Sequence, residues 1–298
     1  MSDIEKRLLA IRDDRGQGAN QLAGDALALL GAAALAAPGR DPGEIIAEAH
    51  GLTARLILLR PSMAAIANWS LNWWQELSAR PDAAAALVAE FGQRHDATAA
   101  ALTQSAEQAL GSARSVLSLS YSSAVEAVLA AAPGLERVVI GEGRPRLEGR
   151  CLAQALQSHI PDVDLIIDAG LAHFAAQVDC VILGADSICR DGAAVNKIGS
   201  LAAALGAEAA GVPCLIVADT YKLDPIHTAS NMALEEMAAE EVWPEQPEMC
   251  RNPYFETVPE RLITAYASEK GVLSAAQLAP EFERWRELHA SFHSHSPA

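Results

Sequence analysis

The chain places a carboxylate and a lysine around one short polar loop, a pairing that suits chemistry on a phosphorylated substrate. Asp186 directly follows an apolar run, Val181–Leu183, and a small Gly-Ala pair, so it lies at the carboxyl end of a predicted buried strand. Asn196 and Lys197 are expected to open a helix that continues to residue 210. A helix N-terminus and a lysine together favour an anion, with Asp186 beside it as an acid or base. An ordinary capped surface loop is the alternative interpretation of this segment alone.

Polar residues also follow the strands predicted at 115–119, 137–140 and 214–217. The serines after the first of these strands can cap the next helix or hold a phosphate. The arginine after the second suits bidentate phosphate binding, or is simply an exposed arginine. A lysine follows the last strand. The tip residues added by these strands are Ser122, Ser123, Arg144 and Lys222. Their convergence with Asp186 would form a pocket for a phosphorylated polyol.

Strand-like and helix-like segments alternate regularly after residue 111, which indicates an α/β fold with a doubly wound parallel sheet. Ligands of such sheets bind outside the carboxyl ends of the strands. The segment 1–111 reads as successive helices and is expected to form a helical N-terminal domain, followed by an α/β domain at 112–298. A helix is expected at 234–242, and residues 291–298 are expected to fray. The strands are predicted at 115–119, 137–140, 163–167, 180–183 and 214–217, and the helices between them at 122–132, 148–159, 171–177 and 198–210.

Composition narrows the classes of partner. The 298 residues include 22 basic and 38 acidic side chains, a formal charge of −16, which argues against nucleic acid as a main partner. No apolar run is long enough to span a bilayer, and no membrane association is expected. The five cysteines form no CxxC pair and read as reduced thiols of a cytoplasmic protein. No zinc pattern is found, and neither a metal nor a cofactor is expected.

These motifs resemble those of the alpha/beta/delta subunit family of translation initiation factor 2B. That family includes the ribose-1,5-bisphosphate and methylthioribose-1-phosphate isomerases. The core of the resemblance is Gly184-Ala-Asp186 with Asn196-Lys-Ile-Gly199, supported by Glu142-Gly-Arg-Pro145 with Glu148-Gly149, by Asp168-Ala169 and by Asn252–Pro259. Gly18-Ala19 and Arg60-Pro61 resemble the two N-terminal phosphate-side loops of the family. The resemblance implies a helical N-terminal domain, a Rossmann-like α/β domain and a homodimer or larger homo-oligomer.

The chain departs from the family pattern at residues that would transfer protons in the isomerases. The isomerases carry a cysteine at the tip of the first strand, paired with the aspartate that Asp186 matches, and here Ser120 holds that place. A tuned thiol titrates near neutrality, whereas a hydroxyl does not. The arginine usual before the Gly-Ala pair is displaced as well, because Gln17 precedes Gly18 and the nearest arginine is Arg15.

Two hypotheses remain open. In the first, the protein is an aldose–ketose isomerase of a pentose phosphate, with Asp186 and Ser120 as catalytic residues. In the second, it is a non-catalytic regulatory subunit that binds a sugar phosphate or nucleotide. Both predict homodimers, with the acidic segment 234–255 near the contact. The predicted ligand-binding residues are Gly18, Ala19, Arg60, Ser122, Ser123, Arg144, Asn196, Lys197 and Lys222.

Overall fold

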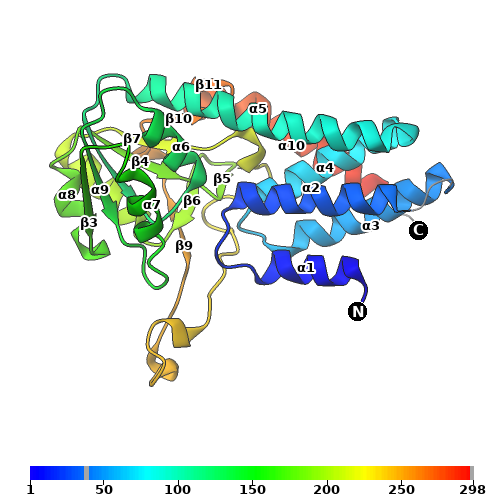
Figure 1. Ribbon diagram of the computed structural model, residues 1–298, viewed down its shortest axis with the longest axis horizontal. Coiled ribbons are helices and arrows are strands. Elements are labelled where there is room, and N and C mark those ends of the chain that lie inside the picture. Colours follow the sequence, from blue (N-terminus) through cyan, green and yellow to red (C-terminus); the bar gives the residue numbers. More distant parts are fainter. Residues whose placement is uncertain (37–39, 296–298) are drawn as a thin grey trace.

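A computed structural model describes residues 1–36 and 40–295, and the chain begins with a layer of long helices (Figure 1). Ala- and Leu-rich α2 is buried along much of its length, packed between α3, α4 and α5. Trp69 on α4 is buried and stacks on Tyr221, with ring centroids 3.6 Å apart, so the aromatic residues of this helix pack in the core. The helices are α1 (Asp3–Asp13), α2 (Ala19–Leu35), α3 (Pro42–Leu59), α4 (Ala64–Ala79) and α5 (Ala84–Leu110).

The strands that follow confirm the predicted parallel sheet. In the described part of the chain, a seven-stranded sheet has the order β11-β10-β7-β4-β1-β2-β3, and its pairs are parallel except for β10–β11. The strand order reverses at β1, which lies between β2 and β4, so the carboxyl ends of β1 and β4 flank the topological switch point. The strands are β1 (Ser115–Leu119), β2 (Arg137–Gly141), β3 (Asp162–Ile166), β4 (Cys180–Gly184), β7 (Cys214–Val217), β10 (Ala265–Ser268) and β11 (Gly271–Leu273).

Helices cover both faces of this sheet, as a doubly wound fold requires. Buried side chains of α5, α6 and α7 form one apolar cluster with the sheet, and those of α8 and α9 join a second cluster that continues into the helical layer. The connecting helices are α6 (Ser123–Ala131), α7 (Gly149–Leu156), α8 (Leu171–Ala175) and α9 (Ser200–Ala210), close to the predicted ranges.

A small second sheet corrects the prediction that Asn196 and Lys197 open a helix. These two residues end β6 (Ala194–Lys197), and α9 begins only at Ser200, after Gly199 at φ 105°. β6 pairs antiparallel with β5 (Ser187–Cys189) and with β9 (Phe255–Val258), while β8 (Leu223–Asp224) pairs with β5. Lys197 therefore presents its side chain from a strand, and its position depends on pairing with a remote part of the chain.

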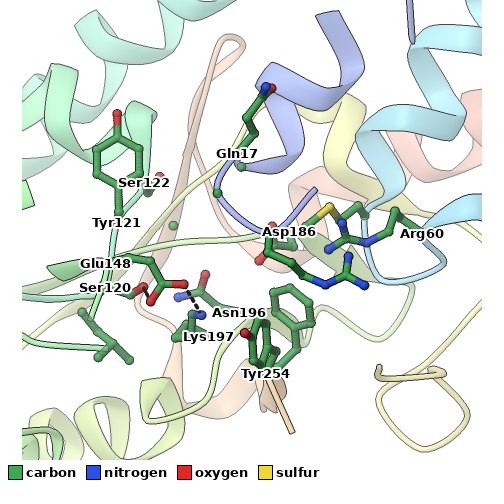
Figure 2. A pocket seen from close by; sticks show the side chains of 17 residues that line it. Gln17, Arg60, Ser120, Tyr121, Ser122, Glu148, Asp186, Asn196, Lys197 and Tyr254 are labelled. Atoms are coloured by element: carbon green, nitrogen blue, oxygen red, sulfur yellow. Dashed lines mark hydrogen bonds and ion pairs between the residues drawn. The ribbon is translucent and has the colours of Figure 1, made fainter. Parts of the chain in front are cut away.

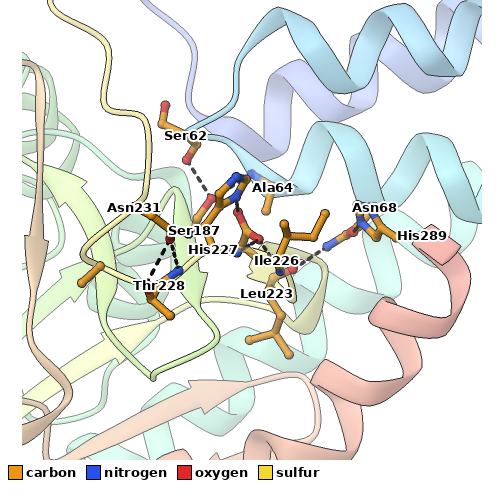
Figure 3. Close-up of polar contacts among 12 residues, drawn as sticks. Ser62, Ala64, Asn68, Ser187, Leu223, Ile226, His227, Thr228, Asn231 and His289 are labelled. Carbon is orange, nitrogen blue, oxygen red and sulfur yellow. Dashed lines mark hydrogen bonds and ion pairs between the residues drawn. The ribbon is translucent and has the colours of Figure 1, made fainter. Parts of the chain in front are cut away.

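Polar contacts join the helical layer to the sheets (Figure 3). The Ser187 hydroxyl donates to the Ser62 carbonyl oxygen at 2.7 Å and accepts from the Ala64 N–H at 2.9 Å. The side-chain amide of Asn68 donates to the Leu223 carbonyl oxygen at 2.8 Å. These bonds are buried, so they fix the turn between α3 and α4 against β5, and α4 against β8.

The last part of the chain differs most from expectation. The helix predicted at 234–242 is wrong: this segment extends away from the body, and its helical part is the short 3₁₀ turn η4 (Ala239–Glu241) (Figure 1). Residues 291–298 are predicted to fray, but residues 291–294 belong to α10 (Ala279–Ser294), which packs on α4. Residues 296–298 lie outside the described residues. A C-terminal helix thus joins the N-terminal helical layer, and the domain division at residue 111 stays a prediction.

Candidate active site

A pocket opens at the switch point between β1 and β4, where the sheet meets the helical layer (Figure 2). The tips of β1 and β4, the end of β6, the loop before α2 and the turn after α3 all contribute side chains to its wall. Segments far apart in sequence thus converge on one cavity. The predicted site residues that line it are Gly18, Arg60, Ser120, Ser122, Asp186, Asn196 and Lys197.

Asp186 lies at the turn by which the chain leaves the large sheet for the small one. Its N–H donates to the Val195 carbonyl oxygen at 2.8 Å, which ties the tip of β4 to β6. Burial raises the pKa of its carboxyl above the usual range, and the nearby charges of Lys222, Lys197 and Arg60 only partly offset this. The protonated form of Asp186 is therefore favoured more than in water, which suits a residue that gives and takes a proton.

Lys197 and Ser120 share one carboxylate, that of Glu148. The Lys197 Nζ donates to Glu148 Oε1 at 2.8 Å, and the Ser120 hydroxyl lies 3.5 Å from Oε2 (Figure 2). Lys197 is buried and its ammonium also lies 4.4 Å from the ring centroid of Tyr254, a cation–π contact. The chain turns at Ser120, directly after the end of β1. Its φ is 61°, a left-handed conformation that is uncommon for serine.

The serines after β1 have different positions. Ser122 lines the pocket and is also the N-cap of α6, accepting a hydrogen bond from the Val125 N–H at 3.4 Å. Its hydroxyl oxygen lies close to the tip of β4: a Cβ added to Gly184 would be only 2.8 Å from it. Ser123 is the first residue of α6 and does not line the pocket.

The N-terminal side of the pocket is built by two loops. Gly18 is the N-cap of α2 and lines the cavity, whereas Ala19 is buried in the first turn of that helix. Arg60 is 6% exposed and donates from Nη1 to the Asp14 carbonyl oxygen at 2.9 Å, while its Nε has no hydrogen-bond partner among the described residues. Burial lowers the pKa of this guanidinium, and Glu235 nearby opposes that effect. The Nε lies 3.9 Å from Glu235 Oε1, a long ion pair that leaves the buried guanidinium able to bind an anionic ligand as well.

Two predicted cations do not reach the cavity. Arg144 is exposed and donates from Nη2 to the Val242 carbonyl oxygen at 3.4 Å. Its loop is turned toward β3 because the backbone N–H groups of Gly143 and Arg144 donate to the Asp168 carboxylate at 2.9 and 2.7 Å. Lys222 is buried behind the pocket, where its charge acts on Asp186 without lining the cavity.

The pocket also contains residues that are not among the predicted site residues. Arg15 lines it beside Gly18, and Glu148 and Tyr254 face it from other segments. Glu148 and Tyr254 each fall within a motif of the resemblance, which was the available signal. No cluster of three or more His, Cys, Asp or Glu side chains that could hold a metal ion occurs among the described residues. Over the same residues, no helix combines the length and apolar character needed to cross a membrane.

These features define an α/β protein with a doubly wound parallel sheet and a candidate ligand pocket at its switch point. The chain belongs to the initiation factor 2 subunit family, because the sequence model of that family matches residues 15–275. The matched range includes α2, the strand tips and every residue named above as lining the pocket.

Some relatives of the chain are named as isomerases and others as translation initiation factor subunits. It is 37% identical over 141 residues to a ribose 1,5-bisphosphate isomerase of Archaeoglobus fulgidus, which covers 46% of this chain and 45% of that protein. The chain thus spans about half the length of the isomerases that it matches in this way. It is 29% identical over 225 residues to a Pyrococcus furiosus protein named as a translation initiation factor eIF-2B subunit 2-like, covering 74% of this chain and 79% of that one.

Solved structures agree on the fold. Translation initiation factor eIF-2B of Pyrococcus horikoshii superposes with a TM-score of 0.80 at 23% identity, covering 92% of this chain and 98% of that one. The 5-methylthioribose 1-phosphate isomerase of the same organism gives a TM-score of 0.72 at 22% identity, covering 98% and 88%. At these identities the likeness shows the fold alone.

Proposed function

We propose that the protein binds a phosphorylated pentose at this pocket and interconverts its aldose and ketose forms. The observation that carries the proposal is the position of Asp186, a carboxylate of raised pKa placed at the switch point among the buried cations Arg60 and Lys197. The cations attract the phosphate, and the carboxylate moves the proton. Relatives named as ribose 1,5-bisphosphate isomerases support the substrate class.

Each predicted binding residue has a place in this proposal. Arg60 and Lys197, with the free N–H groups at the start of α2, hold phosphate groups. Asn196 and Ser122 offer donors and acceptors to the hydroxyl groups of the sugar. Gly18 has no side chain, so the ligand can come close to the protein backbone at the start of α2. Ala19, Ser123, Arg144 and Lys222 act, on this proposal, by shaping the loops and the charge around the cavity rather than by lining it.

A second candidate is a regulatory subunit that binds the same ligand without turning it over. Ser120 favours it, because a hydroxyl at the tip of β1 does not titrate at neutral pH. The relative named as a translation initiation factor eIF-2B subunit 2-like, which aligns over most of both chains, also supports it.

Turnover separates the two candidates. Purified protein is incubated with a panel of pentose phosphates, and ketose formation is followed together with the melting temperature. An isomerase converts one of them, and Asp186→Asn reduces the rate by roughly 10²-fold or more while ligand still raises the melting temperature. Ligand-specific stabilisation without turnover on any member of the panel favours the regulatory subunit instead.

We propose further that the protein forms a homodimer through the projecting segment 234–253. Trp243 and Met249 in this segment are 47% and 70% exposed, although large apolar side chains are usually covered. The segment is held in an ordered turn by the Arg251–Glu236 ion pair and by the Asn252 side chain, which donates to the Ala238 carbonyl oxygen at 2.7 Å.

A further inference from the structure

Glu148 is a second carboxylate of the pocket, and the roles proposed so far do not use it. It directly precedes α7, where the Gly149 N–H donates to the Glu142 carbonyl oxygen at 2.9 Å. A Cβ on Gly149 would lie 2.1 Å from the Gly141 carbonyl oxygen, so glycine alone lets the chain press against the tip of β2. The backbone of Glu148 is therefore fixed beside the sheet edge, and its side chain points into the pocket (Figure 2).

The carboxylate of Glu148 is held by two groups of the site. Lys197 donates to Oε1 at 2.8 Å, and the Ser120 hydroxyl lies 3.5 Å from Oε2. The side chains of Glu148 and Lys197 are 19% and 10% exposed, so the pair is largely removed from water. A loosely placed surface glutamate would have neither the two partners nor the burial. This geometry is that of a functional group held in one orientation.

An aldose–ketose isomerisation moves one proton between two carbon atoms and another between two oxygen atoms. Among the described residues that line the pocket, Asp186 and Glu148 are the carboxylates, and the Ser120 hydroxyl is too weak an acid to replace either. We propose that Glu148 is the base that transfers the carbon-bound proton, while Asp186 serves the oxygens. This inference rests on the proposed isomerase function and assigns a catalytic residue to it.

The step balances with these two groups. The step applies to an open-chain aldose phosphate whose C1 is a free aldehyde. Glu148 removes the proton from C2, and the C–H electron pair forms the C1–C2 double bond. The carbonyl electron pair moves to O1, which takes a proton from Asp186. Glu148 then returns its proton to C1, and the C2 hydroxyl gives its proton to Asp186 as the C2 carbonyl forms. Both side chains regain their starting protonation states, and the substrate is converted without any co-reactant.

Lys197 has a positioning role in this scheme. Its ammonium has three donors, so it can keep its bond to Glu148 while it binds a phosphate oxygen. The phosphate thus places the sugar carbons beside the base. The two roles can be separated by kinetics. Loss of the Glu148 carboxylate is expected to lower kcat, whereas loss of the contact between Lys197 and the phosphate is expected to raise KM.

The test compares Glu148→Gln with Glu148→Asp and with the control Glu142→Gln. Glu142 is a matched control, because its side chain is 18% exposed and pairs with Arg150 at 3.6 Å but does not line the pocket. Turnover is measured on a pentose phosphate that the wild type converts, and exchange of the C2 hydrogen is followed in D₂O. Glu148→Gln is expected to lower kcat by about 10²-fold or more with little change in KM and to stop the exchange.

Glu148→Asp keeps the carboxylate and is expected to recover part of the rate, and Glu142→Gln is expected to match the wild type. Glu148→Gln with unchanged kcat, or with a raised KM alone, overturns the assignment of the base and leaves the isomerase proposal standing. A wild type that converts no member of the panel overturns the isomerase proposal, and the assignment of Glu148 with it.

Discussion

Ser187, the residue after Asp186, donates its hydroxyl hydrogen to the carbonyl oxygen of Ser62 at 2.7 Å. Both residues are fully buried. The same hydroxyl accepts from the N–H of Ala64 at 2.9 Å, so one side chain satisfies two backbone groups of the turn that carries Arg60. Ser187 thus helps to fix Asp186 relative to Arg60, although it does not itself line the cavity.

Ser187→Ala is expected to destabilise the protein. It leaves a buried carbonyl oxygen and a buried N–H without this partner, and each such group costs about 1–3 kcal/mol. The free energy of unfolding, measured in urea, should fall by that order, and the stabilisation by ligand should weaken because Arg60 is less well placed. Ser158→Ala, at an exposed serine, is the control and should change stability by less than about 0.5 kcal/mol. Equal stability of the two variants would contradict this role.

Lys197→Ala is expected to remove most of the stabilisation by a phosphorylated sugar. In the wild type, ligand at about a hundredfold over its Kd should add ~2.7 kcal/mol to the free energy of unfolding, and the unphosphorylated sugar should add little. The measurement is the melting temperature with and without ligand. Lys6→Ala, at an exposed lysine of α1, should leave the shift unchanged. An equal shift in wild type and Lys197→Ala would place the ligand elsewhere.

The parts of the site that depend on local sequence could be predicted. Asp186 follows a continuous apolar run and a Gly-Ala pair, which mark the end of a buried strand, and β4 ends there. Ser122 precedes a helical segment and caps it. Local patterns of this kind need no knowledge of the rest of the chain.

The parts that depend on remote pairing could not be predicted. The sequence predicts a helix start at Lys197 because Gly199 and Ser200 follow it, but the pairing of β6 with β9 makes Lys197 the end of a strand. The same pairing brings Tyr254 to the pocket. Arg144 is at a strand tip as expected, yet the Asp168 carboxylate turns its loop away from the cavity. A short polar strand has no distinctive period, so its partner decides its structure.

The projecting segment is expected to form the contact of a homodimer. Light scattering at micromolar concentration should give twice the mass of the chain, and the double variant Trp243→Glu, Met249→Glu should give the mass of one chain, because two charges would be buried in the contact. Leu58→Glu is the control, since Leu58 is also exposed, at 77%, but lies on α3. A monomeric wild type, or a dimer unaffected by the double variant, would exclude this contact.

Asp186→Asn is expected to stabilise the protein at neutral pH. Burial raises the pKa of the Asp186 carboxyl in the folded state, so between the ordinary aspartate value of about 4 and the raised value the folded protein binds more protons than the unfolded chain. The stability that Asp186 contributes is complete below the ordinary value and is lost as pH rises through the raised one. An asparagine has no such loss, so the variant should be more stable than the wild type at pH 7, and the difference should shrink toward pH 4.

Urea denaturation across this pH range measures the difference, with Asp25→Asn, at an exposed aspartate of α2, as the control for a change of net charge. The control should follow the wild type at every pH to within about 0.5 kcal/mol. The opposite result, a variant less stable than the wild type at pH 7, would mean that attraction to Lys222, Lys197 and Arg60 outweighs the cost of burying the carboxylate. Asp186 would then be ionised in the free protein, and it could accept a proton from the substrate but not donate the first one.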